Sequence, residues 1–343
     1  MTNERDRVPR LRRTRRALWG LTLTLAMLGP AAAAEAVKIG VTKLASNSQI
    51  AIARDKGYFA AEGLTPELVF FDAQQPIAVA LASGDLDFGN AAETAALYSL
   101  AGQGTLRIIG GGVSEAPTFH YLALLVSNKA YAAGLKSAKD LPGHSFALTQ
   151  VGTGLQFSLG IIAEKYGFDV KSVQLLPLQS NANIASALAG GRADSAIFSS
   201  TGALPLIKRG DAQLLFWSGD ETGRLQANLL LTSPKMAEEH RDTVERFLRA
   251  IRKGSRDYHD AFTGPDEKRA DQATAPEILD IIAKYLGQPV ELVKLGLPYL
   301  DRDARLSAKD VQHQIDWYRA QGLLKGEASA DALIDKRYAQ LLR

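Results

Sequence analysis

Two stretches of this chain, about a hundred residues apart, share one pattern. Residues 80–87 and 187–194 each carry the end of a helix, a glycine stop and an aspartate that enters a strand. Around both stretches, short β-branched runs alternate with helical segments, which is typical of an α/β domain with a mostly parallel sheet. Two copies this far apart do not make a solenoid. The sequence therefore predicts two similar α/β lobes.

The expected elements divide the chain between these lobes. The strands are 37–41, 67–71, 86–89 and 106–109, then 146–149, 173–178 and 193–198, and the helices are 49–56, 76–82, 91–101, 155–166 and 183–189. Two long apolar strands, 121–126 and 228–232, lie between the two sets; if they pair, the chain crosses to a second lobe and back, leaving a cleft. From Lys235 onward the pattern is mostly helical. We assign residues 35–122 and 228–343 to lobe 1 and residues 123–227 to lobe 2.

The first 34 residues have the pattern of an export signal. Seven arginines precede an apolar run at 17–29, and small residues follow at 30–34, so cleavage is expected after Ala34 or Ala36. Residues 14–18 also resemble a twin-arginine signal, and both export routes stay open. We expect a periplasmic protein and, beyond this signal, no apolar run long enough to span a membrane.

The charge balance changes once this segment is set aside. The whole chain carries +3, but residues 1–34 hold seven basic and two acidic residues, which leaves −2 on the rest. A nearly neutral body gives no electrostatic basis for nucleic-acid binding. We expect no nucleic-acid partner and a monomer.

The residues that usually carry catalysis or metal binding are sparse. The chain has no cysteine, and its histidines lack the i, i+4 spacing of a metal motif: His120, His144, His240, His259 and His313. Residues 112–116 lack the last glycine of a nucleophile elbow, and residues 152–157 fail the dinucleotide pattern. We expect no metal, no cofactor and no enzymatic activity.

A binding site is instead indicated at loops that follow the strands. Gly152, Thr153 and Gly154 stand between a strand and a helix, where free backbone N–H groups attract anions. A tight turn capped by Thr153 is the alternative. In α/β sheets such loops border the ligand crevice. The candidate substrate-binding residues are Ser46, Asn47, Ser48, Gln49, Glu93, Thr94, Gly152, Thr153, Gly154, Ser199, Ser200 and Trp217. The polar ones could equally cap helices, and Trp217 could be core.

Several segments in one order resemble a known family. Residues 57–64, 80–89, 139–143, 187–194 and 314–318 with Gly322 resemble the nitrate/taurine/sulfonate group of ABC-transporter substrate-binding proteins. The resemblance implies a bilobed periplasmic-binding-protein fold with a helical C-terminus. It also implies a small anionic ligand held at a helix N-terminus between closing lobes, and an ABC permease in the inner membrane as partner.

Residues 91–96 are most similar to the aliphatic-sulfonate members of that group. Glu93 is retained there, whereas both prolines of the pattern are replaced, and residues 195–200 lack the Trp and Pro common in that branch. The resemblance thus favours a sulfonate, with taurine, nitrate and aromatic carboxylates as alternatives. Relatives of the same fold that make the thiamine pyrimidine carry a cysteine motif and a histidine-rich site, which this chain lacks.

Overall fold

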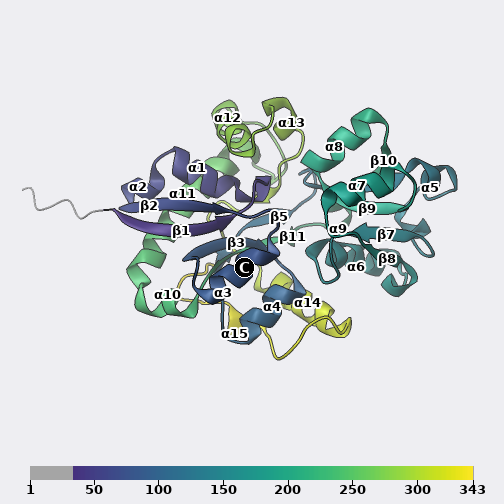
Figure 1. Ribbon diagram of the computed structural model, residues 1–343. Coiled ribbons are helices and arrows are strands. Elements are labelled where there is room, and N and C mark those ends of the chain that lie inside the picture. The colour runs from purple at the N-terminus through teal and green to yellow at the C-terminus, as the bar shows by residue number, and fades with distance from the viewer. Residues whose placement is uncertain (1–33, 343) are drawn as a thin grey trace, which may run out of the picture. The chain divides into compact units, whose positions relative to one another are not determined.

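The computed structural model describes residues 34–342, shown in Figure 1. The expected export signal, apart from Ala34, lies outside the described residues. Within residues 34–342, no helix is both long and apolar enough to cross a membrane. Two five-stranded sheets and one three-stranded sheet organise this part of the chain.

The first sheet has the strand order β2-β1-β3-β12-β4. Its strands are β1 (Glu35–Val41), β2 (Leu64–Phe70), β3 (Phe88–Ala92), β4 (Arg107–Gly111) and β12 (Asn228–Thr232). β2, β1 and β3 run parallel, and β12 is antiparallel to both β3 and β4. The sheet thus takes one strand from far along the chain.

The second sheet has the order β10-β6-β9-β7-β8. Its strands are β6 (Leu122–Ser127), β7 (Ser145–Leu148), β8 (Gln174–Pro177), β9 (Ser195–Ser199) and β10 (Ala212–Trp217). β8, β7 and β9 run parallel, and β6 is antiparallel to both β9 and β10. The predicted α/β fold class with two lobes is confirmed.

The two apolar strands expected to pair at the crossing do not pair with each other. β6 lies within the second sheet and β12 within the first, because each is apolar on both faces and belongs between helical layers. The strands that pair at the crossing are β5 (Val113–Glu115) and β11 (Leu225–Gln226). They form the small third sheet together with β13 (Tyr299–Leu300).

The helices cover both faces of each large sheet (Figure 1). They are α1 (Ser48–Asp55), α2 (Tyr58–Ala61), α3 (Gln75–Ser83), α4 (Ala95–Gly102), α5 (Asn128–Ala132), α6 (Gly154–Tyr166), α7 (Asn181–Ala189), α8 (Ser200–Arg209), α9 (Ser218–Thr222), α10 (Pro234–Glu239), α11 (Arg241–Phe262), α12 (Ala275–Leu286), α13 (Val290–Lys294), α14 (Ala308–Ala320) and α15 (Ala330–Leu333), with 3₁₀ turns at Ala45–Asn47, Ala138–Asp140 and Val170–Ser172. The helix expected at 91–101 begins only at Ala95, because Ala91 and Ala92 still pair with β12.

Side-chain alternation explains the layers. In β6, Leu124 and Val126 join the core with α6, whereas Ala123 and Leu125 face α7 and α8. In β12, Leu229 and Leu231 face α3 and α4, and Leu230 faces α1 and α11. The carboxyl ends of the parallel strands in both sheets carry the loops that form the cavity described below.

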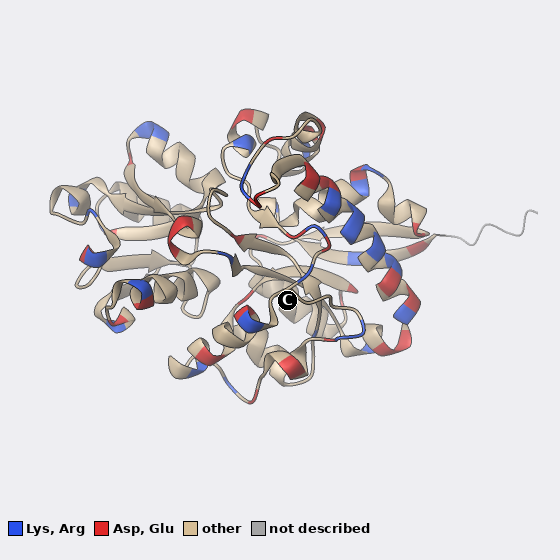
Figure 2. Cartoon of the chain, turned by 180° about the vertical axis from the view of Figure 1, so that it is seen from behind, with Lys and Arg blue, Asp and Glu red and all other residues tan. Residues whose placement is uncertain are grey.

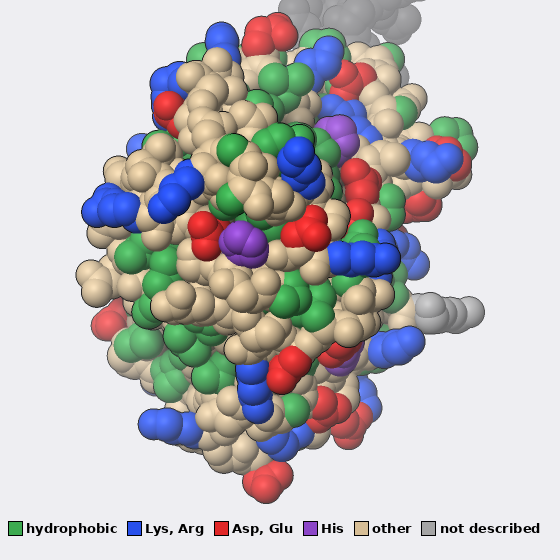
Figure 3. Space-filling model, turned by 90° about the vertical axis from the view of Figure 1, so that its right-hand side faces the viewer, with side chains coloured by type: hydrophobic (Ala, Val, Ile, Leu, Met, Phe, Trp, Pro, Cys, Tyr) green, Lys and Arg blue, Asp and Glu red, His purple; other side chains and the backbone are tan. Residues whose placement is uncertain are grey.

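The surface is mixed in charge. Lys and Arg alternate with Asp and Glu along α11, and both signs are spread over the other helices (Figure 2). On the face of the second lobe, charged side chains of both signs are scattered among apolar ones (Figure 3). Glu62 binds both Arg249 (2.8 Å) and Lys253 (2.9 Å) of α11.

Candidate ligand-binding cavity

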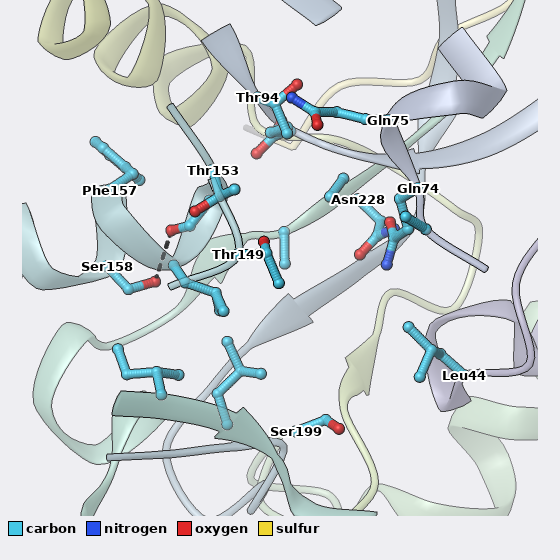
Figure 4. Close-up of a pocket in the computed structure, with 18 of the residues that line it drawn as sticks. Leu44, Gln74, Gln75, Thr94, Thr149, Thr153, Phe157, Ser158, Ser199 and Asn228 are labelled. Carbon is cyan, nitrogen blue, oxygen red and sulfur yellow. Dashed lines mark hydrogen bonds between the residues drawn. The ribbon is translucent and has the colours of Figure 1, made fainter. Parts of the chain in front are cut away.

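A cavity of about 480 Å³ lies where the loops of the two large sheets meet. Its wall is drawn from both sheets and the third: Leu44, Asp72, Ala73, Gln74, Gln75, Ala92, Glu93, Thr94, Glu115, Tyr121, Leu122, Thr149, Gln150, Thr153, Gly154, Leu155, Phe157, Ser158, Gln179, Ser180, Asn181, Ile197, Phe198, Ser199, Leu225, Gln226, Ala227, Asn228 and Gln314. In Figure 4, Thr153, just before α6, and Phe157 and Ser158, within it, lie on one side of the cavity, opposite Gln74 and Asn228. This volume is in the usual range for a small-molecule site.

Five helices begin at the cavity wall. The residues at their first turns or caps that line it are Gln75 (α3), Thr94 (α4), Thr153 and Gly154 (α6), Ser180 and Asn181 (α7), and Ser199 (α8). The N-terminus of a helix carries about half a positive charge on N–H groups that lack an intrahelical acceptor. The wall therefore offers hydrogen-bond donors and positive potential without a basic side chain.

The helix termini at the wall differ in whether a side chain caps them. The Thr94 hydroxyl accepts a hydrogen bond from the N–H of Leu97 at 3.1 Å, and Ser180 does the same for Asn183 at 3.2 Å. Thr153 makes no such bond, and its Oγ1 has no partner within residues 34–342. The α6 terminus, like those of α3 and α8, thus has no side-chain cap, and the Thr153 hydroxyl is left without an internal partner.

The charged side chains of the wall are all acidic. Among the described residues that line the cavity, none is Lys, Arg or His, whereas Asp72, Glu93 and Glu115 are present. Asp72 is exposed, but Glu93 and Glu115 are each only 1% exposed. Burial raises the pKa of Glu93 well above its usual value, and Asp310 adds to the rise. Burial likewise raises the pKa of Glu115, with Asp220 adding to it.

Apolar and amide groups fill the remaining wall. Leu122, Leu155, Phe157, Ile197 and Phe198 supply an apolar lining. At the opposite side, the Asn228 Nδ2 donates to Gln74 Oε1 at 2.6 Å. A ligand here would place an apolar body against one part of the wall and polar groups against the rest.

The two lobes touch beside the cavity. The N–H of Ala95 donates to the carbonyl of Gly152 at 3.0 Å, which joins the start of α4 to the loop before α6. Further along α6, the Phe157 and Trp317 rings are edge to face with centroids 5.5 Å apart. A Cβ on Gly160 would lie 2.5 Å from the Trp317 ring, so α6 packs tightly on α14. The cavity is closed on this side by direct contact.

Comparison with known proteins agrees with this geometry. A family model described as NMT1/THI5 like matches residues 46–268, which is more than half of the chain. The chain belongs to this family. No curated protein matches it.

Several solved structures have a fold similar to that of this chain. The alkanesulfonate-binding protein SsuA from Xanthomonas axonopodis pv. citri, bound to MOPS, is 22% identical with a TM-score of 0.68, covering 89% of this chain and 99% of that one. The periplasmic aliphatic sulphonate binding protein SsuA from Escherichia coli is 17% identical with a TM-score of 0.68, covering 89% and 98%. The periplasmic nitrate-binding protein NrtA from Synechocystis PCC 6803 is 13% identical with a TM-score of 0.68, covering 88% and 86%. The chain thus has the bilobed periplasmic-binding-protein fold.

Five of the twelve residues expected at the site line the cavity, and seven do not. The five are Glu93, Thr94, Thr153, Gly154 and Ser199, and the others are Ser46, Asn47, Ser48, Gln49, Gly152, Ser200 and Trp217. Asn90 Nδ2 donates to the Ser46 carbonyl and to Asn47 Oδ1, which ties this buried turn to β3. Ser48 and Gln49 are also fully buried, in the first turn of α1.

The other three outlying residues have structural partners. The N–H of Gly152 donates to Gln156 Oε1 at 2.7 Å, directly behind the α6 terminus. Ser200 Oγ donates to the carbonyl of Gly296 at 2.7 Å, which links α8 to the segment after α13. The Trp217 ring stacks on His120 with centroids 4.6 Å apart, outside the cavity.

Several lining residues were not expected from sequence. Glu115 and Tyr121 flank the first crossing between the lobes, and Gln226 and Asn228 lie at the second, in β11 and at the start of β12. Gln314 reaches the cavity from α14, where its Nε2 binds Glu93 Oε2 and the Gln226 carbonyl. The signal for Gln179 to Asn181 was available, because this loop follows β8 as residues 149–153 follow β7. Within the described residues, no group of three or more His, Cys, Asp and Glu could hold a metal.

Proposed function

We propose that this protein is the periplasmic receptor of an ABC import system and that it binds a small organic acid, of the sulfonate type, in the cavity between its lobes. The observation that carries this proposal is the convergence of five helix N-termini on one cavity. The acidic group would accept hydrogen bonds from the N–H groups at the start of α6 and from the Thr153 hydroxyl. The ABC permease in the inner membrane would receive the solute.

The size and lining of the cavity favour an organic anion over an inorganic one. A water molecule takes about 30 Å³ of liquid volume, so a cavity of about 480 Å³ is far larger than nitrate needs. Apolar side chains such as Phe157 and Phe198 would be left against empty or wet space by so small an ion. An alkyl or aromatic body would fill it. Sulfonates and aromatic carboxylates both meet this requirement.

Binding rather than catalysis is favoured by the residues at the wall. None of the chain's five histidines is among the described residues that line the cavity, and the chain has no cysteine. The carboxyls present are buried, with the Glu93 carboxyl held by Gln314. The wall offers hydrogen-bond donors, amides and apolar surface, which orient a solute without an evident nucleophile.

Thermal unfolding with candidate solutes tests the proposal. The purified chain lacking residues 1–34 would be melted with ethanesulfonate, taurine, benzoate, benzenesulfonate or nitrate, each at millimolar concentration, and hits confirmed by calorimetric titration. A ligand present at about 100 times its Kd stabilises the folded state by about 2.7 kcal/mol. We expect an organic acid to raise Tm and nitrate to have no effect. If none of the organic acids shifts Tm or gives binding heat, the proposal is wrong.

A further inference from the structure

Glu115 is a buried carboxyl without a partner at the wall of the proposed binding cavity. It ends β5, at the first crossing between the lobes, and is 1% exposed. Neither of its carboxyl oxygens makes a hydrogen bond of normal geometry within residues 34–342. No basic side chain is among the described lining residues to compensate it.

Glu93, the other buried carboxyl of the wall, has a hydrogen-bond partner inside the protein for one of its two oxygens. Its Oε2 accepts a hydrogen bond from Gln314 Nε2, which also donates to the Gln226 carbonyl. The Tyr318 hydroxyl donates to the Glu93 backbone carbonyl at 3.2 Å. Glu93 therefore belongs to a network that links β3 to α14, whereas Glu115 stands apart from such a network.

The surroundings of Glu115 leave the cavity as the place for a partner. The backbone N–H groups of Gly219 and Leu122 approach the carboxyl and act to lower its pKa, but neither makes a hydrogen bond of normal geometry, and burial and the nearby Asp220 carboxylate raise the pKa overall. Asp220 is itself occupied, because its Oδ1 accepts a hydrogen bond from the N–H of Thr118 at 3.0 Å. A buried carboxyl is costly unless it is hydrogen-bonded, and an N–H group is the donor that relieves this most strongly when charged.

We propose that Glu115 is the specificity-determining residue that receives an amine or other N–H group of the bound solute. The inference rests on the proposed function and deepens it, because the solute would carry a donor as well as an acidic end. The free N–H groups at α6 and the Glu115 carboxyl then bind opposite ends of a molecule whose apolar body lies against Phe157 and Leu122.

Matched probe pairs test the role of Glu115. Calorimetric titration would compare ethanesulfonate with taurine, and benzoate with 4-(aminomethyl)benzoate, in the wild type and in Glu115→Gln. The glutamine keeps the size of the side chain but cannot carry a negative charge. In the wild type, we expect the amino member of a pair to bind at least tenfold more tightly, a difference of about 1.4 kcal/mol. In Glu115→Gln, this preference should fall to less than threefold, while the affinity for the desamino member stays unchanged.

Glu67→Gln is the matched control, because it makes the same substitution at an exposed carboxyl that does not line the cavity. It should keep the amine preference. If the wild type binds a desamino probe yet gains nothing from the amine, the role of Glu115 is refuted and the proposed function stands. If no probe binds the wild type, both are refuted.

If Glu115 serves only to stabilise the fold, the titrations and melting curves should give a different result. Glu115→Gln would then lower Tm of the ligand-free protein and weaken both members of a pair equally, which also refutes the proposal. Should the variant fail to fold, the amine preference of the wild type decides between the outcomes.

Discussion

The two large sheets have the same topology but are built from different parts of the chain. β2-β1-β3-β12-β4 and β8-β7-β9-β6-β10 each contain three parallel strands followed by two antiparallel pairings. In both sheets the fourth strand is the one that follows a crossing, since β6 follows β5 and β12 follows β11. β6 and β12, which the sequence predicted to pair with each other, are thus equivalent strands of two different sheets.

The equivalence extends to single side chains. Asp87 Oδ2 accepts a hydrogen bond from the N–H of Lys38 at 2.7 Å, and Asp194 Oδ2 accepts one from the N–H of Ser145 at 2.9 Å. Each aspartate directly precedes the first paired residue of its own strand, and it accepts from the amide that directly precedes the first paired residue of the neighbouring strand. The aspartate that recurs in the sequence therefore makes the same hydrogen bond to a neighbouring strand in both lobes.

The sheets differ in what lies beneath the covering helix. Gly40 pairs with Gly89 in the first sheet, and at the same place Ala147 pairs with Ala196 in the second. A Cβ on Gly89 would lie 2.7 Å from Ile77 and 2.8 Å from Leu81 of α3. The same strand order therefore accommodates two kinds of helix–sheet packing. The glycine pair lets α3 lie close to the first sheet, and the second sheet has an alanine pair at the same place.

The largest expected loss of stability follows from replacing Asp194, and it should exceed the loss from replacing Asp87. Asp194→Ala removes the bonds from the Ser145 N–H and Oγ, both 2.9 Å, and should lower the free energy of unfolding by about 2–3 kcal/mol. Asp87→Ala removes the Lys38 bond at an exposed site and should cost about half as much. Urea denaturation of both variants measures this, and equal losses would contradict the ranking.

The pH dependence sharpens the Asp194 result. Although burial opposes it, the hydrogen bonds from Ser145 and the neighbouring His144 hold the pKa of Asp194 below its usual value. A group whose pKa is lower when folded contributes stability above its unfolded pKa of about 3.9 and loses it as the pH falls through the folded value. The difference in the free energy of unfolding between the wild type and Asp194→Ala should therefore have its full size at pH 6 and become smaller below about pH 4.

The second largest loss of stability is expected from changing the Gly40–Gly89 pair of the first sheet or the Ala147–Ala196 pair of the second. Gly89→Ala should cost about 1–3 kcal/mol through overpacking against Ile77 and Leu81, which outweighs the gain of up to about 1 kcal/mol from a stiffer unfolded chain. Ala196→Gly in the second sheet should cost about 1 kcal/mol for the opposite reason, a more flexible unfolded chain. A Gly89→Ala variant as stable as the wild type would show that α3 shifts freely on its sheet.

The smallest effect separates two threonines at the cavity. Thr94→Ala should lower the free energy of unfolding by about 1 kcal/mol, because its hydroxyl caps α4. Thr153→Ala removes a hydroxyl with no internal partner, so stability should hold while affinity for an organic acid falls about tenfold. Melting curves and calorimetric titration of both variants distinguish these roles, and a loss of stability without loss of affinity at Thr153 would make this residue a structural cap.

Sequence periodicity was sufficient for the lobes but not for the pairing between them. Short apolar runs and glycine stops marked β1, β3, β7 and β9 to within a few residues. Neighbours of β6 and β12 could not be inferred, because a strand that is apolar on both faces fits any position between two helical layers. Their partners depend on the chain path, which local patterning does not encode.

The cavity shows the same division. Thr153 and Gly154 were predicted because a strand-to-helix loop has a recognisable composition. Glu115, Tyr121 and Gln314 were not, since each reaches the cavity from an element of a different part of the chain. Conversely, Ser46 to Gln49 have the polar composition of a binding loop but are buried, because Asn90 draws that turn against β3.

The position of β12 has a consequence for the order in which the chain acquires its structure during synthesis. β4 ends at Gly111, but its only strand neighbour, β12, begins at Asn228, so the edge of the first sheet stays incomplete while more than a hundred further residues are added. The second sheet draws all its strands from residues 122–217. Contacts close in sequence form sooner than distant ones. The first sheet is therefore completed only once Asn228–Thr232 has joined it, and until then the edges of β3 and β4 are open to pairing with other chains.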